Sequence, residues 1–236
     1  MKGFIFLILL LLPNLSQVES AELPSTFERP QKLLVTYVDH PSIKPYLELF
    51  TQVYQQDLHI DIELRPIPAM RGLIQLEKGL TDADVIRVPE SIASFENIVE
   101  VEPQLGFAQI QLLCLPGELC DLTILENPAL DIETNMGNSY LLQGYNIKAQ
   151  LHFNENMQST LNMLRAKRIK YAIFVTPKNN YQVLQDEFNQ LPLKTVKLIH
   201  IINKKYAPLL PELTKSLQKR LPSFQKERHL INLPSN

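Results

Sequence analysis

The chain has 236 residues, of which 45% are hydrophobic and 20% charged, and its formal net charge is −2 at pH 7. This length allows one or two domains with a proper hydrophobic core. The ordinary apolar content and the lack of a fixed sequence period exclude collagen, coiled coil and low-complexity disorder. The near-neutral charge argues against a nucleic-acid-binding protein, which needs a basic surface.

The first twenty residues (1–20) have the pattern of a secretory signal peptide. Lys2 gives a positive start, Phe4–Leu12 is an unbroken apolar run, and Val18 and Ser20 are small residues before the expected cleavage point. A membrane anchor is the alternative, but crossing roughly 30 Å of hydrocarbon takes about 20 apolar residues in a helix. We therefore expect a cleaved signal peptide and a mature chain exported to the periplasm.

The two cysteines, Cys114 and Cys120, are predicted to form a disulfide bond. Export places them in an oxidising compartment, and Pro116 and Gly117 between them favour a turn that brings the two sulfurs together. Closing so short a loop constrains the unfolded chain by roughly 2 kcal/mol. A metal site or a reactive thiol is the alternative, but no histidine or second cysteine pair follows at a zinc-like spacing.

The first part of the mature chain alternates strands and helices. Apolar and β-branched runs predict three strands, and apolar residues at helical spacing predict two helices between them. Pro45 suits the first turn of the first helix, and Gly79 is expected to end the second. Such an alternation with short connections builds an open parallel sheet covered by helices. The predicted strands are 32–38, 59–67 and 82–88.

The second part repeats this pattern less regularly. A loop that runs into a helix is expected over 136–145, and Asn154 is the expected cap of a helix that carries Met157, Leu161 and Leu164. A helical stretch around 179–190, an amphipathic C-terminal helix over 208–221 and a loose tail complete the chain. The predicted strands are 107–115, 129–135, 148–153, 168–176 and 193–204.

This ordered set of segments resembles the extracellular solute-binding protein family 3, the two-lobed periplasmic receptors typified by polar amino-acid-binding proteins. Each segment is unspecific by itself, and the resemblance rests on their order and spacing behind a signal peptide. The segments are LLVTYVDHP (33–41), MRGLIQLEKGLTDADVIR (70–87), VEVEPQLGFAQIQLL (99–113), STLNMLRAKRIKYAIFV (159–175) and LIHIINKKYAPLLPELTKSLQKRL (198–221).

The resemblance implies an α/β, two-lobed periplasmic-binding-protein fold of type 2, with two crossover hinge strands and a C-terminal helix. Lobe 1 would comprise residues 22–105 plus 195–236, and lobe 2 residues 106–194. A ligand would lie in the cleft between the lobes, which would close about the hinge. An independent rule agrees, because open α/β sheets bind ligands beyond the carboxyl ends of their strands.

Two candidate ligand-binding residues follow the first predicted strand. Tyr37 can stack on a small solute or hydrogen-bond to it, and Asp39 can pair with a cationic group. The alternative is structural, with Tyr37 in the core and Asp39 capping the next helix.

Two arginines are candidates for binding an anionic group. Arg87 ends the third predicted strand, where its guanidinium could hold a carboxylate by two parallel hydrogen bonds. The family often has an arginine after this strand in that role. The alternative is a surface ion pair of Arg87 with Glu90 or Asp84. Arg71, at the start of the second predicted helix, is a weaker anion candidate, because a solvated helix residue is the better explanation of it.

In the second lobe, Asn138 and Ser139 stand at the expected start of a helix, where free backbone N–H groups attract anions. They also serve as an ordinary helix cap. Thr176, after the strand YAIFV, is the last candidate. The family commonly places an aspartate near this point for the α-amino group, whereas this chain reads VTPKNN. An α-amino acid ligand would therefore need Asp39 or Glu155 in its place.

The sequence favours a monomeric periplasmic binding protein that captures a small polar, carboxylate-bearing solute for a membrane transporter, such as an ABC transporter, or for a sensor. Two alternatives stay open: a periplasmic lyase or dehydratase on the same scaffold, and a receptor-like module that binds a protein partner.

No cofactor is expected, since GxSxG, HExxH and P-loop motifs are absent. The five histidines lack metal-ligand spacing; they are His40, His59, His152, His200 and His229.

Overall fold

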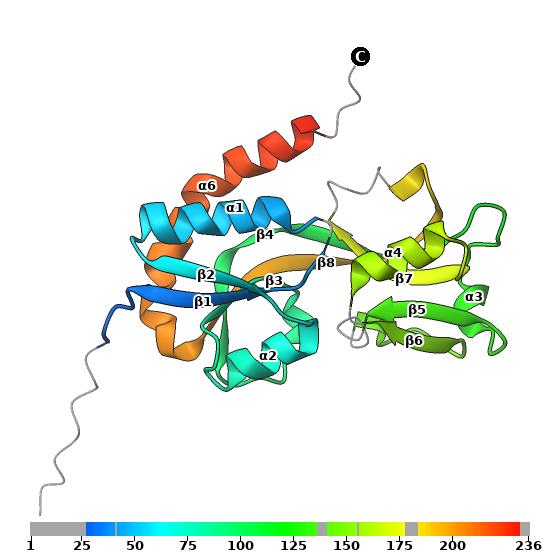
Figure 1. Ribbon diagram of the computed structural model, residues 1–236, viewed down its shortest axis with the longest axis horizontal. Helices are drawn as coiled ribbons and strands as arrows, with labels where there is room; N and C mark the ends of the chain where they lie inside the picture. The colour runs from blue at the N-terminus through cyan, green and yellow to red at the C-terminus, as the bar shows by residue number, and fades with distance from the viewer. Residues whose placement is uncertain (1–26, 41, 136–140, 155, 178–183, 232–236) are drawn as a thin grey trace, which may run out of the picture.

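The computed structural model describes residues 27–40, 42–135, 141–154, 156–177 and 184–231. In these residues the strands form one mixed sheet of 8 strands in the order β2-β1-β3-β8-β4-β7-β5-β6 (Figure 1). The strands are β1 (Lys32–Tyr37), β2 (Asp61–Pro66), β3 (Ala83–Arg87), β4 (Ile98–Cys114), β5 (Asp131–Asn135), β6 (Gln150–Asn154), β7 (Tyr171–Pro177) and β8 (Asn189–Asn203).

Helices cover this sheet in both halves of the molecule (Figure 1). None of the described helices combines the length and the apolar character that crossing a membrane requires. The α-helices are α1 (Lys44–Thr51), α2 (Ala69–Glu77), α3 (Thr123–Glu126), α4 (Met157–Arg165) and α6 (Leu210–Ile231), and α1 continues as a π-helical segment, Gln52–Asp57. Short 3₁₀ turns occupy Pro89–Ser91 and Lys204–Leu209.

Two long antiparallel strands, β4 and β8, join the halves of the sheet. They have 17 and 15 residues and pair from Ile98 with Asn203 to Cys114 with Asn189. On one side, β3 pairs with β8 and the parallel strands β1 and β2 follow. On the other, β7 pairs with β4 and leads to β5 and β6. The predicted two-lobed α/β fold with two crossover strands and a C-terminal helix is thus confirmed.

In the first lobe, α1 and α6 lie on one side of the sheet and α2 on the other (Figure 1). The helical face predicted from the sequence is buried, with Phe50, Val53 and Tyr54 at 0% exposure. Phe50 stacks on the ring of His200 from β8 at a centroid distance of 4.0 Å. The predicted helix ends are also correct, because Pro45 lies in the first turn of α1 and Gly79, with φ of +68°, follows α2.

His200 is a core histidine with both ring nitrogens bonded. Nε2 lies 2.7 Å from the Tyr54 hydroxyl and Nδ1 lies 3.2 Å from the carbonyl oxygen of Val85. A carbonyl only accepts, so Nδ1 carries the hydrogen and Nε2 accepts from Tyr54. Burial lowers the pKa of His200 to about 4, which keeps the ring neutral.

The second lobe departs from the sequence predictions at two helices. Of the loop and helix expected over 136–145, the structure describes residues 141–145, which form a 3₁₀ turn at 141–142 followed by a turn and a bend, without an α-helix; Leu141 and Leu142 are buried there. The cap of α4 is Asn156 and not Asn154: its side chain accepts a hydrogen bond from the backbone N–H of Ser159 at 3.0 Å. The expected helix around 179–190 lies partly outside the described residues, and β8 already begins at Asn189.

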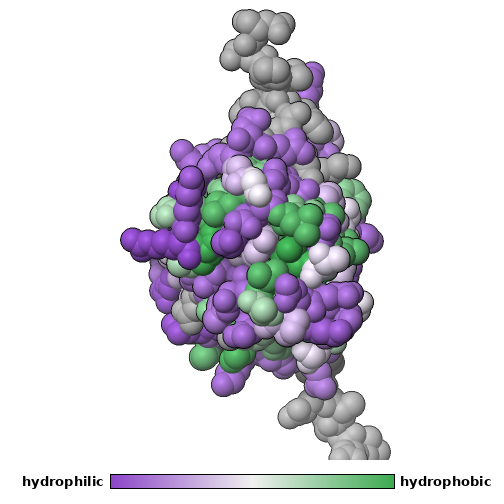
Figure 2. Space-filling model, turned by 90° about the vertical axis from the view of Figure 1, so that its right-hand side faces the viewer, coloured by the Kyte–Doolittle hydropathy of each residue, from purple (hydrophilic) through white to green (hydrophobic). Residues whose placement is uncertain are grey.

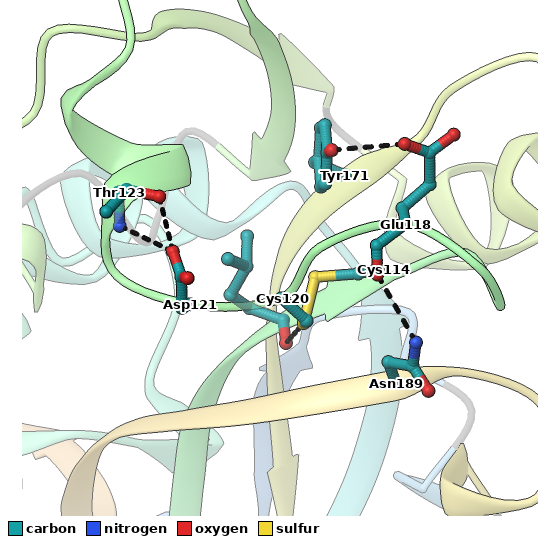
Figure 3. The surroundings of a disulfide bond; sticks show 8 residues. Cys114, Glu118, Cys120, Asp121, Thr123, Tyr171 and Asn189 are labelled. Atoms are coloured by element: carbon teal, nitrogen blue, oxygen red, sulfur yellow. Dashed lines mark hydrogen bonds between the residues drawn. A yellow bond between two sulfur atoms is a disulfide. The ribbon is translucent and has the colours of Figure 1, made fainter.

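The predicted disulfide bond between Cys114 and Cys120 is present, with 5.8 Å between the two Cα atoms (Figure 3). Cys114 is buried at the end of β4, and Glu118 in the loop that the bond closes accepts hydrogen bonds from Tyr171 of β7 and Asn189 of β8. Glu118 in this loop accepts a hydrogen bond from the Tyr171 hydroxyl at 3.4 Å and pairs with Lys170 at 2.9 Å. The loop is thereby fixed to the strand that follows α4.

The end of the second lobe exposes apolar side chains among charged ones. Figure 2 looks onto this end and shows hydrophobic patches within a hydrophilic surround. The large exposed hydrophobic residues of this lobe include Leu119, Leu122 and Phe153, at 60%, 52% and 43% exposure. Leu119 and Leu122 stand in or next to the disulfide loop, which therefore carries an apolar outer surface.

Candidate ligand-binding cleft

A cavity of about 110 Å³ lies between the two lobes. Residues at the carboxyl ends of strands from both lobes line it: Val38 after β1, Arg87 at the end of β3, Asn135 at the end of β5 and Val175 near the end of β7. This is the edge where an open α/β sheet is expected to bind ligands. The other lining residues are His40, Ser42, Ile43, Tyr46, Ala69, Ile86, Val88, Ala108, Leu141, Met157 and Leu198.

Arg87 lines the cavity but is largely held inside the first lobe. Its side chain is 5% exposed, and Nη2 donates a hydrogen bond to Oδ2 of Asp84 at 2.5 Å. Thr36 Oγ1 lies 2.7 Å from the same oxygen. Of the two partners considered from the sequence, Asp84 is therefore correct, although the pair is buried and not on the surface; Glu90 pairs with Lys194 at 2.9 Å.

Gly72 of α2 makes room for the Arg87 guanidinium. A Cβ atom at this glycine would lie 2.8 Å from Arg87 Nη2 and 3.4 Å from Asp84 Oδ2. The first distance is tighter than ordinary van der Waals contact, and the second is at the lower limit of such contact. Any side chain at this position would therefore displace the guanidinium.

The Asp84–Arg87 pair leaves polar atoms unsatisfied. Among the described residues, Asp84 Oδ1 and Arg87 Nε are buried and have no hydrogen-bond partner. Burial raises the pKa of Asp84, and the charge and hydrogen bond of Arg87 act in the opposite direction. A buried donor without an acceptor costs about 1–3 kcal/mol, and more when the group is charged. A ligand oxygen that accepted from Arg87 would remove that cost.

His40 connects the two lobes at the wall of the cavity. Its Nε2 lies 2.9 Å from the carbonyl oxygen of Val175, and its Nδ1 accepts a hydrogen bond from the backbone N–H of Ser42 at 3.0 Å. Nε2 must then carry the ring hydrogen. The ring also lies 5.4 Å from the ring of Phe174, and burial lowers the pKa of His40 to about 4.

The other predicted residues of the first lobe do not line the cavity. Tyr37 is half-buried and packs against the core, and Asp39 and Arg71 are exposed. The position of Tyr37 against the core fits the structural alternative that the sequence analysis offered for it. A ligand-binding role for these three residues stays a prediction.

In the second lobe, Thr176 is buried and its Oγ1 accepts a hydrogen bond from Gln111 Nε2 at 3.0 Å, away from the cavity lining. Asn138 and Ser139 lie outside the described residues. Asn135, which the sequence analysis did not single out, lines the cavity and donates from Nδ2 to the carbonyl oxygen of Asn154 at 3.0 Å. Its position at a strand end is the signal that could have identified it.

The described lining of the cavity has few ionisable side chains. Among the described residues that line it there is no aspartate or glutamate. Across the described part of the chain, no three His, Cys, Asp or Glu side chains are grouped so as to hold a metal ion. The described lining thus supplies the Arg87 guanidinium, a histidine whose nitrogens are both bonded, the polar side chains of Ser42, Tyr46 and Asn135, and an apolar wall.

No protein-family model and no curated protein matches this sequence. Solved structures match it in three dimensions. An ancestral amino-acid-binding protein, AncCDT-1, described as a precursor of cyclohexadienyl dehydratase, has 12% identity and a TM-score of 0.70 over 84% of this chain and 96% of its own. The GluR0 ligand-binding core in complex with L-glutamate has 15% identity and a TM-score of 0.65 over 86% and 98%.

A third match is the amino acid ABC transporter substrate-binding protein AbpA from Streptococcus pneumoniae, bound to L-arginine. It has 13% identity and a TM-score of 0.67 over 87% of this chain and 97% of its own. At such identities the likeness shows the fold. The chain has the two-lobed architecture of the type 2 periplasmic binding proteins.

Proposed function

We propose that this protein is an exported binding protein that holds a small solute in the cavity between its lobes. The observation that carries the proposal is the cavity itself, which lies at the carboxyl ends of strands from both lobes and includes the buried Arg87 in its wall. The solved structures with this fold, described as amino-acid-binding, support the proposal, and so does the N-terminal segment with the pattern of a signal peptide.

The solute carries a carboxylate that Arg87 binds. A guanidinium has five N–H donors in a fixed fork, and the charged hydrogen bonds that it makes to carboxylates are stronger than neutral ones. Arg87 Nε is a buried donor that lacks an acceptor among the described residues. Closure of the lobes would exclude water from this contact, which strengthens it.

The bound solute is delivered to a membrane transporter or a sensor. AbpA, a binding protein of an amino acid ABC transporter, has the same fold over 87% of this chain, which supports a transporter as the first candidate partner. The mature chain is taken to act as a periplasmic monomer.

A catalytic function is less well supported than binding. A general acid or base must lie within hydrogen-bond reach of the ligand with a pKa near the working pH. Among the described lining residues, His40 is the histidine that could act so, and both of its ring nitrogens are bonded to the backbone of Ser42 and Val175. The precursor of a dehydratase among the matching structures keeps the enzyme as the alternative that the experiment below must exclude.

The test is thermal unfolding of the purified chain starting at Ala21, against a panel of amino acids, carboxylic acids, amines and short peptides. A ligand at 100 times its Kd adds about 2.7 kcal/mol, which raises Tm by roughly 5–10 °C in a chain of this size. A rise in Tm with a ligand that stays chemically unchanged supports binding. Consumption of the ligand would make the protein an enzyme, and the lack of any shift across the panel would refute the proposal.

The role of Arg87 is tested with the double variant Asp84→Asn, Arg87→Gln, which removes both charges together. The single variant Arg87→Gln would leave the Asp84 carboxylate buried without its partner, so that loss of folding would be confused with loss of binding. The double variant is expected to fold, as judged by its circular dichroism, and to lose the thermal shift. An unchanged shift in this variant would show that Arg87 does not bind the ligand.

A further inference from the structure

A hydrogen bond joins the two lobes at the wall of the cavity, between Nε2 of His40 and the carbonyl oxygen of Val175 at 2.9 Å. We propose that this bond is a pH-sensitive latch, which holds the lobes closed while the His40 ring is neutral and releases them when the ring is protonated. The proposal concerns the regulation of the cavity and rests on the binding function proposed above.

The contact depends on the angle between the lobes. His40 follows β1 of the first lobe, and Val175 lies on β7 of the second (Figure 1). Three strands, β3, β8 and β4, stand between β1 and β7 in the sheet order. Neighbouring strands are about 4.8 Å apart, so a flat sheet separates β1 from β7 by roughly 19 Å. The bond therefore spans the two halves of the sheet, and a rotation of one half against the other changes its length directly.

The crossover strands have a place where such a rotation can occur. The pairing of β4 with β8 is regular up to Val101 and resumes at Gly106. In this interval β4 has residues 102–105 where β8 has a single residue, 199, so the ladder is interrupted. Gly106 has a φ of +148°, which glycine adopts without strain. Backbone rotation at a few residues of this kind is the usual basis of hinge motion between domains.

Protonation removes the hydrogen bonds that fix the ring. Nε2 of His40 donates to Val175, and Nδ1 accepts from the backbone N–H of Ser42 at 3.0 Å. A second proton sits on Nδ1 and faces this N–H, so the ring has to turn away, which carries Nε2 away from Val175 as well. The ring also lies 5.4 Å from the ring of Phe174, where a charged imidazolium lacks the water that solvates it once the lobes open.

The ionisable groups around the ring leave this preference in place. Burial lowers the pKa of His40 to about 4, although its hydrogen bond to the second lobe and the charge of Asp39 favour the protonated ring. Tyr46 of α1 and Arg87 of β3 line the same cavity, and the positive charge of Arg87 further disfavours a second cation there. On β7, residues 172–177 have no ionisable side chain.

The size of the effect follows from the two forms of the ring. The pKa of His40 is about 4 in the closed form, whereas a histidine in water has a pKa near 6.5. The open form therefore binds the proton more tightly, and the ratio of closed to open molecules falls by up to about tenfold per pH unit as the pH drops from about 6.5 towards 4. A solute held in the closed cavity is released by the same shift, because its apparent affinity scales with the closed fraction.

The test measures the distance between the lobes by single-molecule energy transfer, without any solute. Dyes are attached at two exposed positions, Glu48→Cys on α1 and Asn162→Cys on α4, in the chain starting at Ala21 with its disulfide intact. We expect the ratio of closed to open molecules to fall by up to about 25-fold between pH 7.5 and pH 5. Circular dichroism checks that the chain is folded at both pH values.

Two variants of His40 separate the hydrogen bond from the titration. His40→Gln keeps a side-chain donor for Val175 and does not titrate, so its ratio should change by less than about 2-fold between the two pH values. His40→Ala removes the bond and should lower the ratio at pH 7.5 by about 2- to 13-fold, the effect of one hydrogen bond. The matched control is His152→Gln, which removes an exposed histidine of the second lobe that pairs with Asp131. Its pH response should equal that of the unchanged chain.

Two results would refute the latch: a lobe distance in the unchanged chain that does not respond to pH, or an equal response in His40→Gln. Either result, together with a solute that raises Tm, leaves the binding function standing. If the lobes open through His40 but no solute of the panel binds, the binding function fails, and with it the release of a solute by the latch.

Discussion

His40 in the first lobe donates the hydrogen of Nε2 to the carbonyl oxygen of Val175 in the second lobe, across 2.9 Å. Val175 lies on β7, far from His40 in the sequence, and both residues line the cavity. Nδ1 of His40 accepts a hydrogen bond from the Ser42 N–H. A second proton on the ring would sit on Nδ1 and point at this N–H, so the hydrogen bond would be lost. The bond between the lobes is therefore made by the neutral ring.

This arrangement predicts how stability depends on pH. The pKa values of His40 and His200 are lowered to about 4 in the folded protein, whereas an unfolded histidine has a pKa near 6.5. The unfolded chain therefore binds more protons, and the free energy of unfolding should fall as the pH drops from about 6.5 towards 4. Each histidine contributes a slope of up to about 1.4 kcal/mol per pH unit.

Urea unfolding at pH 7, 6 and 5 measures this slope. His40→Gln removes the contribution of His40 and leaves His200 in place, so its slope should be smaller than that of the unchanged chain by up to about 1.4 kcal/mol per pH unit. Equal slopes in the two proteins would mean that His40 is already protonated or solvated in the folded state.

The charges of Asp84 and Arg87 are predicted to be strongly coupled. Arg87→Gln alone leaves a fully buried carboxylate without its ion-pair partner, which typically costs about 3–5 kcal/mol. The double variant Asp84→Asn, Arg87→Gln should be less destabilised than the sum of the two single variants. A double-mutant cycle from urea unfolding gives the coupling energy. Additive effects would show that the two side chains do not interact in solution.

Gly72→Ala tests the contact of α2 with the guanidinium. The added methyl would meet Arg87 Nη2 at 2.8 Å, and we expect a loss of about 1–3 kcal/mol in the free energy of unfolding from this overpacking. The control is the same change in the double variant Asp84→Asn, Arg87→Gln. There the shorter glutamine should relieve the clash, so that the higher helix propensity of alanine is recovered, about 1 kcal/mol. A similar loss in both backgrounds would assign the effect to other neighbours.

The disulfide bond should matter for stability and not for binding. Reducing the bond between Cys114 and Cys120 is expected to lower the free energy of unfolding by about 2 kcal/mol, as for a short closed loop. Neither cysteine lines the cavity, so ligand affinity should stay the same. The matched control is Cys114→Ala, Cys120→Ala, whose stability must not respond to the reductant. A change in affinity on reduction would contradict this separation.

The elements of the fold could be predicted from sequence because local patterns specify them. The three strands of the first lobe, the buried face around Phe50 and Tyr54, and the end of α2 at Gly79 all follow from apolar periodicity and from backbone preferences. Arg87 was named as a candidate because it is a charged residue at the end of an apolar strand, and it does line the cavity. Each of these signals lies within a few residues of the feature that it predicts.

The partners of the site residues could not be predicted, because they come from distant segments. Nothing near His40 in the sequence indicates that it bonds to the carbonyl oxygen of Val175. Nothing near Thr176 indicates that Gln111 of β4 donates a hydrogen bond to its hydroxyl. A loop running into a helix was expected over 136–145, and in the described residues Leu141 and Leu142 are buried by tertiary packing without forming an α-helix. Tertiary contacts override local propensity at such places.

The continuous pairing of β4 with β8 also has a thermodynamic consequence. The ladder runs through both lobes, and one buried cluster contains residues of each, from Val35 and Val85 to Ile132 and Leu141. Neither lobe can lose its share of this ladder without exposing strand edges and apolar side chains of the other. The two lobes should consequently melt as a single cooperative unit, so that damage at the far end of one lowers the melting temperature of the whole molecule.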